Sequence, residues 1–327
     1  MKTKVVVFLI VAAVGAVGIY QVTGPPTIRF TVHVVGEDGE PLAGVKTSVI
    51  FHPTGHHDQF TQVDVVSNVN GNFTAQGFSH DGTFAVGELL NKDGYYASGV
   101  LIPHFTKTDD LGHWLPWGQT YTTMMRKIGD PIPMYARIVD INIPAVGQPC
   151  AYDLEAGDWV APYGKGLTAD FVFTLQRQWQ AFNNFDVSVV ITFPNSGDGI
   201  QETQLPAEFA DSQFKWPRVA PEDGYQPSLL LRVADSPTTG LQGNIGDKNS
   251  NNRYFFRVRA VESDGNVSSA LYGKISEGIE LAPNSSKTCG IHLAYYLNPT
   301  PNDRNMEYDV QKDLFKNLDW MQAPRTP

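Results

Sequence analysis

Residues 34–49, VVGEDGEPLAGVKTSV, contain two apolar segments separated by a glycine-rich turn. Residues 67–77, SNVNGNFTAQG, and residues 92–99, KDGYYASG, follow the same plan, with Asn-Gly and Asp-Gly as turn signals. Upstream of these segments, polar and apolar residues alternate, and the apolar ones are Ile28, Phe30, Val32 and Val34. This period of two is typical of a half-buried strand. Short strands spaced about ten residues apart predict an antiparallel β-sandwich.

Residues 25–130 resemble the carboxypeptidase regulatory-like domain, a small transthyretin-like or Ig-like β-sandwich common in exported bacterial proteins. The resemblance rests on the order and spacing of the three segments quoted above. It implies a module that extends or supports another domain and carries no catalytic residues. The resemblance therefore concerns the fold of the front third and an exported location, and it implies no activity.

Residues 149–300 also show strand patterns, so the whole chain is predicted to be all-β. We expect a larger β-sandwich or jelly roll there. Locally, residues 254–275, YFFRVRAVESDGNVSSALYGKI, resemble one hairpin of a fibronectin type III domain. The first strand of this hairpin is expected to place Tyr254, Phe256 and Val258 on one face and Arg257 and Arg259 on the other.

Three further segments complete the predicted organisation. Prolines at 131 and 133 indicate an extended linker over 131–148. Residues 174–183 predict either a short helix or a long irregular strand. Residues 301–327 are proline-rich and charged, which indicates a C-terminal tail, with a short helix over 310–318 as one alternative.

Residues 1–24, MKTKVVVFLIVAAVGAVGIYQVTG, begin with two lysines followed by an apolar run from Val5 to Tyr20. This pattern is typical of a secretory signal peptide, and an uncleaved N-terminal anchor is the alternative. The chain is therefore expected to be exported to the periplasm, the cell surface or the extracellular space. We expect membrane contact only through an uncleaved N-terminal segment.

The formal net charge is −10 and the pI is about 5.2, and Lys and Arg form no continuous run. This composition argues against nucleic acid as a partner. Polysaccharide or other envelope proteins are the expected partners. The two cysteines, Cys150 and Cys289, either form one disulfide in an oxidising compartment or are buried free thiols.

A histidine-rich segment, FHPTGHHDQF at 51–60, contains His52, His56, His57 and Asp58. Imidazole and carboxylate are common zinc ligands, but the spacing matches no metalloprotease pattern and no glutamate stands beside it as a base. An exposed loop is the preferred interpretation. We predict no metal and no cofactor.

Residues 103–119, PHFTKTDDLGHWLPWGQ, combine aromatic rings with carboxylates and imidazoles, at His104, Asp109, Asp110, His113, Trp114 and Trp117. Sugar rings stack on aromatic faces while carboxylates accept hydrogen bonds from their hydroxyl groups. The alternative is that the tryptophans pack under the loop, because exposed tryptophans are unfavourable without a partner.

Residues 152–166, YDLEAGDWVAPYGKG, place Asp153, Glu155 and Asp158 close to Trp159 and Tyr163. The stretch resembles a recurring segment of uncharacterised exported bacterial proteins, which implies no activity. Two carboxyl groups facing each other across a cleft can hydrolyse glycosides. The alternative is that Asp158 pairs with Lys165 and the loop shapes a surface.

The sequence contains no G-x-S-x-G nucleophile motif. It therefore predicts an exported, non-catalytic binding or structural protein with a glycan as the favoured ligand. The expected contact residues are Asp109, His113, Trp114, Trp117, Trp159 and Tyr163. The alternative is a polysaccharide-active enzyme that uses two of Asp153, Glu155, Asp158 and Asp198.

Overall fold

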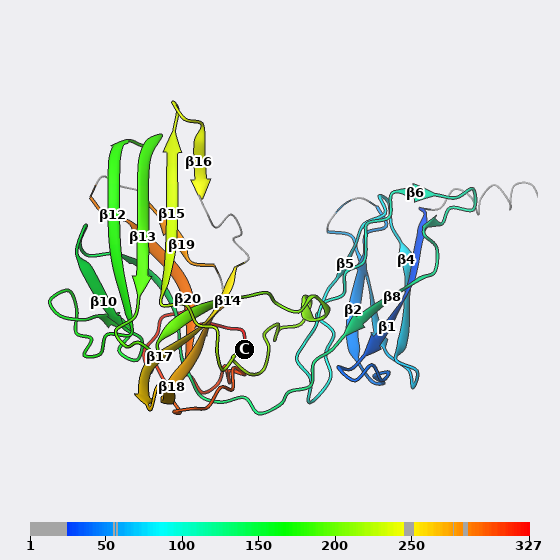
Figure 1. The fold of residues 1–327 in the computed structure, drawn as a ribbon. Coiled ribbons are helices and arrows are strands. Elements are labelled where there is room, and N and C mark those ends of the chain that lie inside the picture. The colour runs from blue at the N-terminus through cyan, green and yellow to red at the C-terminus, as the bar shows by residue number, and fades with distance from the viewer. Residues whose placement is uncertain (1–24, 55, 57, 245–251, 277, 284–286) are drawn as a thin grey trace, which may run out of the picture. The chain divides into compact units, whose positions relative to one another are not determined.

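The computed structural model of the protein describes residues 25–54, 56, 58–244, 252–276, 278–283 and 287–327. Its regular structure is β-strand apart from one short 3-10 helix, Ala207–Phe209, so the all-β prediction is confirmed (Figure 1). The chain forms two compact units. Unit 1 comprises residues up to Ile128 together with Ala207–Lys215, and unit 2 comprises Gly129–Pro206 and Trp216–Pro327.

Two sequence predictions fall on residues outside the described part. The signal peptide or anchor at residues 1–24 is one, and His57 of the histidine-rich loop is the other. Both stay predictions. In the part of the chain that the structure describes, no helix has the length and apolar character needed to span a bilayer.

Unit 1 consists of two three-stranded sheets and a short hairpin. The first sheet has the order β4 (Asn72–Phe78), β1 (Thr27–Val35), β8 (Gln119–Met124), and the second has the order β3 (Thr61–Val66), β2 (Lys46–Phe51), β5 (Phe84–Val86). The hairpin joins β6 (Lys107–Thr108) to β7 (Trp114–Leu115). β1 pairs antiparallel with β4 and parallel with β8, which requires a long crossover in the chain.

The alternation predicted for residues 27–34 builds the core of unit 1. Ile28, Phe30 and Val32 are fully buried, and they pack in one cluster with Val49 and Phe51 of β2. Because β1 and β2 belong to different sheets, this cluster lies between the sheets and the unit is a β-sandwich. Its relationship to the carboxypeptidase regulatory-like domain stays a prediction.

A segment from late in the chain completes unit 1. The amide of Gly99 donates to the carbonyl oxygen of Asp211, and the amide of Gln213 donates to that of Ala97. The Phe214 ring lies 5.3 Å from the ring of Tyr96. Residues 207–215, which were expected in the second domain at 149–300, therefore belong to unit 1, and the predicted boundary is corrected. Local patterns do not show on which unit a connecting segment packs.

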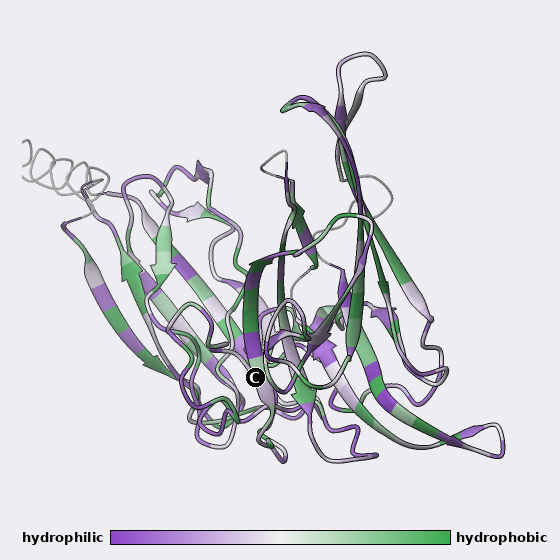
Figure 2. Ribbon diagram, turned by 90° about the vertical axis from the view of Figure 1, so that its left-hand side faces the viewer, coloured by the Kyte–Doolittle hydropathy of each residue, from purple (hydrophilic) through white to green (hydrophobic). Residues whose placement is uncertain are grey.

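Unit 2 contains two six-stranded sheets. The first has the order β11 (Asp158–Trp159), β10 (Pro149–Asp153), β12 (Phe171–Ala181), β13 (Asn184–Thr192), β15 (Ser228–Ser236), β16 (Leu241–Asn244). The second has β14 (Gly199–Thr203), β17 (Arg253–Ser263), β18 (Asn266–Ile275) and β20 (Gly290–Asn298), with β19 (Glu280–Ala282) and β9 (Tyr135–Asn142) also paired to β20. Hydrophobic and hydrophilic residues alternate along these strands (Figure 2).

The structure corrects two boundaries predicted for this region. Residues 135–142 of the predicted linker are β9, which pairs with β20 along its whole length. The predicted tail packs on the outer face of the same sheet, where Met306 and Tyr308 are buried. Residues 310–318 form turns and bends rather than a helix, and residues 171–181 form a continuous strand. These elements are fixed by contacts between segments that lie far apart in the sequence. The composition of a single segment does not reveal such contacts.

The core of unit 2 lies between its two sheets. Phe171 and Leu175 of β12 and Phe256 of β17 are almost fully buried in one cluster. The Phe256 ring stands edge-on to that of Phe171 at 5.1 Å and lies over Gly273, which has no side chain to occupy this space. This packing makes the unit a β-sandwich and rigidly positions the loops at its ends.

Replacing Phe256 with alanine is expected to lower the free energy of unfolding by about 3–5 kcal/mol, because the ring leaves a cavity in the core. Urea denaturation followed by circular dichroism measures this change. Phe182, which is 81% exposed, is the matched control. Its replacement with alanine should change the stability by no more than about 0.5 kcal/mol. Equal effects of the two substitutions would contradict the predicted burial.

Cys150 and Cys289 are both buried and both free, so the disulfide allowed by the sequence is not formed. Burial raises the pKa of the Cys289 thiol to about 11 and also raises that of Cys150. Both side chains belong to the core cluster of unit 2 and act as small hydrophobic residues.

Thiol titration with dithionitrobenzoate, without reductant, tests this state. The native protein should react slowly, and the protein unfolded in guanidinium should release the equivalent of its 2 thiols. Absence of thiol in the unfolded protein would show that the disulfide alternative was right.

Candidate functional site

The predicted catalytic carboxylates lie in a cluster organised by Arg259, which we call the Arg259 cluster and which comprises Arg259, Asp153, Glu155 and Asp170. The Arg259 guanidinium donates to both oxygens of Asp170, at 2.8 and 3.0 Å. Its other contacts are Glu155 Oε1 at 2.9 Å and Asp153 Oδ1 at 3.5 Å. Arg259 belongs to β17 of the second sheet of unit 2. Asp153 ends β10 of the first sheet, and Glu155 and Asp170 lie in the connections between its strands, so the cluster connects the two sheets.

The carboxylate of Asp153 accepts hydrogen bonds mainly from backbone amides of its own loop. Oδ1 accepts hydrogen bonds from the amides of Glu155 and Ala156, and Oδ2 accepts from those of Leu167 and Thr168. Burial raises the pKa of Asp153, but these backbone donors outweigh it and leave the pKa below its usual value. A buried carboxylate with this many donors has little capacity left to exchange a proton with a substrate.

Asp170, which the sequence analysis did not single out, is the fully buried member of the cluster. Burial raises its pKa, and the opposing effect comes from Arg259 and from the amide of Leu154, which donates to Oδ2 at 2.9 Å. Burial lowers the pKa of Arg259, but the carboxylates of Asp170 and Glu155 outweigh it and keep the guanidinium charged. The cluster is therefore an inter-sheet ion pair with complete hydrogen bonding.

Asp158 and Asp198, the other two acids of the enzyme hypothesis, also accept hydrogen bonds from backbone amides. Asp158 accepts from the amides of Trp159 and Lys165, so its contact with Lys165 involves the main chain. Asp198 accepts from the amide of Ala260 at 2.7 Å and from the side chain of Asn195 at 2.8 Å. These contacts assign a structural role to the carboxylates that sequence analysis offered as catalytic.

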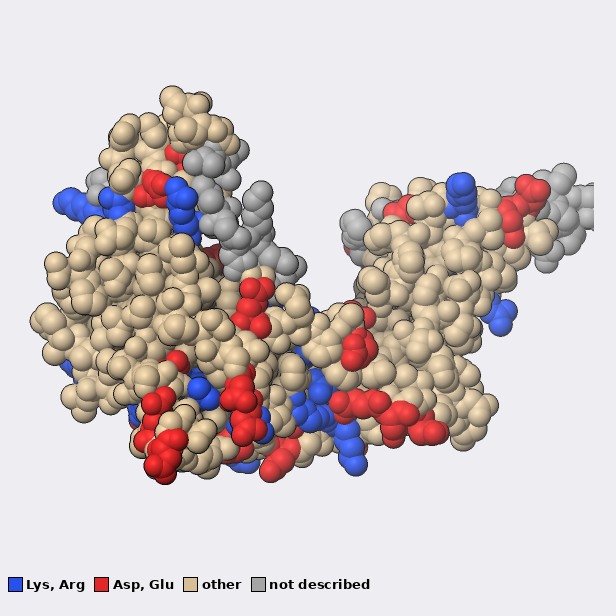
Figure 3. All heavy atoms as spheres, viewed as in Figure 1, with Lys and Arg blue, Asp and Glu red and all other residues tan. Residues whose placement is uncertain are grey.

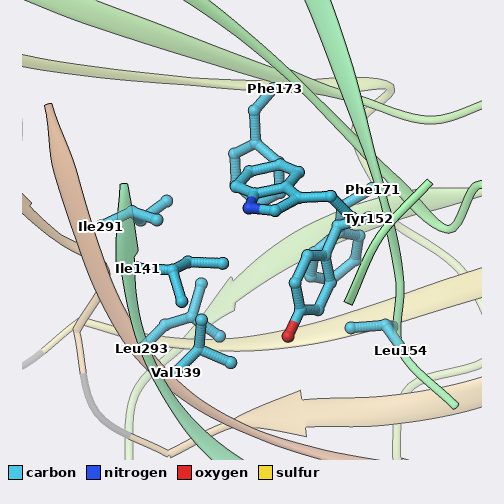
Figure 4. A pocket seen from close by; sticks show the side chains of 9 residues that line it. Val139, Ile141, Tyr152, Leu154, Phe171, Phe173, Ile291 and Leu293 are labelled. Atoms are coloured by element: carbon cyan, nitrogen blue, oxygen red, sulfur yellow. The ribbon is translucent and has the colours of Figure 1, made fainter. Parts of the chain in front are cut away.

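Trp159 was predicted to contact ligand but is a core residue. Its ring is 7% exposed and stands edge-on to Tyr152 at 5.3 Å and to Phe173 at 5.5 Å. Together with Leu293 and other apolar residues it lines a small cavity inside unit 2 (Figure 4). The cavity leaves about 10 Å³ for the centre of a water-sized sphere, which is too small for an organic ligand. Tyr163 is on the surface of unit 2 and 40% exposed.

The aromatic loop of unit 1 separates its two tryptophans. Trp114 packs against the core cluster, and its indole N–H donates to the carbonyl oxygen of Ser79 at 2.9 Å. Trp117 instead stacks on the imidazole of His113, with ring centroids 4.0 Å apart and an interplanar angle of 25°. The packing alternative thus describes Trp114, whereas Trp117 is partly buried but does not pack against the core cluster.

Asp109 fixes this aromatic stack. One of its oxygens accepts from the amides of Leu111 and His113, and the other lies 3.0 Å from Nδ1 of His113. The backbone amide of His113 is the largest contribution that lowers the pKa of Asp109, so its carboxylate is charged at neutral pH. The turn, the imidazole and the indole are therefore held in one arrangement.

The stack continues into an outward-facing apolar surface. Thr27 of β1 pairs with Phe78 on one side and with His113 on the other. His113 and Leu115 point away from the core, because side chains alternate along a strand and Trp114 points inward. We call this surface the Trp117 platform; it comprises Phe78, His113, Leu115 and Trp117. Phe78 is 54% exposed and Leu115 is 41% exposed. His104 and Asp110 are also exposed in this loop, and no contact brings either to the platform.

The histidine-rich loop supplies no metal centre in the described part of the chain. Three or more His, Cys, Asp or Glu side chains do not come together as metal ligands among the described residues. His56 and Asp58 are exposed and His52 is half-buried.

A groove in unit 2 escaped the sequence analysis. It lies on the outer face of β9 and β20, because the alternate residues of β20 fill the core on the other face. Its volume is about 450 Å³. The strands contribute Ile138, His292, Ala294 and Tyr296, and the C-terminal segment contributes Trp320, Met321, Ala323, Pro324, Arg325 and Thr326. The groove was missed because residues 301–327 were predicted to be a tail, although the exposed aromatic Trp320 was a signal in the sequence.

Comparison with known proteins gives no family. No protein-family model matches the chain, and no curated protein matches it. Among solved structures, a mutant form of the shaft pilin SpaA from Lactobacillus rhamnosus GG aligns with 53% of this chain and 89% of its own, at 15% sequence identity and a TM-score of 0.20. A TM-score this low does not indicate a shared fold.

Replacing Arg259 with methionine is expected to reduce the free energy of unfolding by about 3–5 kcal/mol at pH 7, because Asp170 stays buried without its cation. The pKa of Asp170 is raised in the folded protein, so its ionisation costs stability as pH rises through that value. The loss should therefore shrink below about pH 4, where Asp170 is protonated.

Urea denaturation at pH 7 and pH 3.5 measures this difference. Arg232→Met is the control, because Arg232 and Asp186 form an ion pair in which both side chains are 38% exposed. That substitution should cost less than about 1 kcal/mol. A loss in Arg259→Met that is equally large at both pH values would contradict the role of Asp170.

Proposed function

We propose that the protein is exported and acts as a non-catalytic binding or structural component of the cell envelope or extracellular space, with a glycan as its ligand. The N-terminal sequence, with two lysines before an apolar run, supports export. Two β-sandwich units support a rigid scaffold whose loops are free to bind. The single observation that carries the binding function is the Trp117 platform.

The platform has the chemistry that carbohydrate binding requires. The partly buried indole of Trp117, held in place by His113, offers a flat apolar face for the C–H groups of a sugar ring. The surrounding apolar side chains extend this face, and exposed apolar patches on soluble proteins mark interaction sites. The position of the ring is fixed before binding through Asp109, which reduces the entropy lost on association.

The contacts of the candidate acids support a non-catalytic role over glycoside hydrolysis. A hydrolase needs one carboxyl group that carries a proton and a second that faces the substrate. Here Asp153 and Asp198 are buried and accept backbone amides, and Glu155 is bound to Arg259. In a purely structural role within an envelope assembly, the same rigid units would contact a neighbouring envelope protein instead of a glycan.

The purified protein should co-sediment with insoluble polysaccharide or isolated cell-envelope material without releasing soluble sugar. Replacing Trp117 with alanine should raise the dissociation constant about 2- to 10-fold, which corresponds to loss of one stacking contact. Phe182→Ala, which removes an exposed aromatic ring of unit 2, is the matched control and should bind as wild type. Unchanged binding by Trp117→Ala would refute the platform, and released oligosaccharide would refute the non-catalytic role.

A further inference from the structure

The groove on the outer face of β9 and β20 has the dimensions of a ligand site. Its volume of about 450 Å³ falls within the range of small-molecule pockets, roughly 300–1,000 Å³. The C-terminal segment is fixed at two points along it. The amide of Ile138 donates to the carbonyl oxygen of Gln322, and the hydroxyl of Tyr296 donates to that of Thr326 at 3.1 Å. Both walls of the groove are therefore set by the fold of unit 2.

Trp320 is an aromatic ring held at the rim of this groove. The carboxylate of Asp319 accepts hydrogen bonds from the amides of Met321 and Gln322, at 2.8 and 3.0 Å. The amide of Ala323 also donates to the carbonyl oxygen of Asp319. This turn fixes the backbone on either side of Trp320 and leaves the indole 71% exposed. Such exposure of the largest side chain is unfavourable unless a partner covers it.

The polar groups of the groove are cationic or neutral. Arg325 lies with its guanidinium carbon 5.9 Å from the centre of the Trp320 ring, and His292 and Ser276 line the strand side. Among the described residues that line the groove there is no Asp or Glu. Across the described part of the chain Arg325 forms no ion pair, whereas Arg218, Arg232 and Arg259 each do.

This charge pattern contrasts with the rest of the protein. The chain has a formal net charge of −10. Figure 3 shows Lys and Arg interspersed with Asp and Glu on the face it draws. Asp140 and Glu280 stand opposite His292 on the neighbouring strands β9 and β19, although neither lines the groove. Beside Trp320, the guanidinium of Arg325 therefore favours an anionic group. The adjacent indole selects a ligand that also has a flat apolar face.

We propose that this groove binds an acidic saccharide, a chain that contains uronic acid or another carboxylated sugar. The sugar ring stacks on Trp320, and its carboxylate accepts hydrogen bonds from the guanidinium of Arg325. His292 and Ser276 lie within the same groove to contact hydroxyl groups. The site belongs to unit 2 and does not require the Trp117 platform of unit 1, so either site can fail without the other.

Isothermal titration of the full-length protein with an oligogalacturonate tests the proposal, and the methyl ester of the same oligomer is the uncharged control. The acidic oligomer should bind about fivefold or more tightly than the ester, because the ester cannot pair with Arg325. Arg325→Gln should remove this preference, whereas Trp320→Ala should weaken binding of both oligomers. Both side chains are exposed, so neither substitution should alter the thermal unfolding of the protein.

Two controls exclude simpler explanations. Lys312→Gln removes the same charge from the C-terminal segment but outside the groove, since Lys312 pairs with Asp309, and it should bind as wild type. Phe182→Ala, which removes an exposed aromatic ring outside the groove, should also bind the acidic oligomer as wild type. An equal loss in Lys312→Gln, no loss in Trp320→Ala, or equal binding of polyglutamate would overturn the proposal. The last result would mean that the groove recognises an acidic peptide instead.

Discussion

The ion pair between Arg259 and Asp170 is the contact on which the organisation of unit 2 depends. It joins β17 of one sheet to the start of β12 in the other, through two hydrogen bonds at a fully buried carboxylate. Arg259 has φ +56°, a left-handed conformation that costs a non-glycine residue about 1–2 kcal/mol. It lies in an irregularity where the register of β17 and β18 shifts between Val258 and Val261. Asp198 supports this geometry by accepting the amide of Ala260.

The same contact determines what the acidic loop can do. Asp170 accepts the amide of Leu154, and the carbonyl oxygen of Leu154 accepts the hydroxyl of Tyr295 from the second sheet at 2.6 Å. The loop between β10 and β12 is therefore tied to both sheets by hydrogen bonds. Its carboxylates are already engaged in the folded state, and a group engaged in this way is unavailable as a general acid or nucleophile.

The sequence allowed prediction of those features that depend on neighbouring residues. Alternation over residues 27–34 correctly indicated a buried face of β1, and the fold class followed from many such segments. Predictions that depend on distant contacts were wrong. Arg259 was expected beside Arg257 on one face, but the register shift turns its side chain toward Asp170. The packing of residues 207–215 in unit 1, the pairing of β9 and the groove beside Trp320 all arise between segments far apart in the chain. The pattern of polar and apolar residues within one segment cannot predict contacts with a distant segment.

The acidic composition also has a structural explanation. Aspartate side chains accept the backbone amide two residues further on at many turns, at Asp38, Asp81, Asp109, Asp153, Asp303, Asp309, Asp313 and Asp319. Aspartate suits this role because its short carboxylate reaches those amides without strain. Much of the negative charge therefore shapes turns and does not in itself indicate a cationic ligand. Two of these turns, at Asp109 and Asp319, position the aromatic rings of Trp117 and Trp320. Arg325 is not used in this way: across the described part of the chain it forms no ion pair, and it lies beside the exposed indole of Trp320.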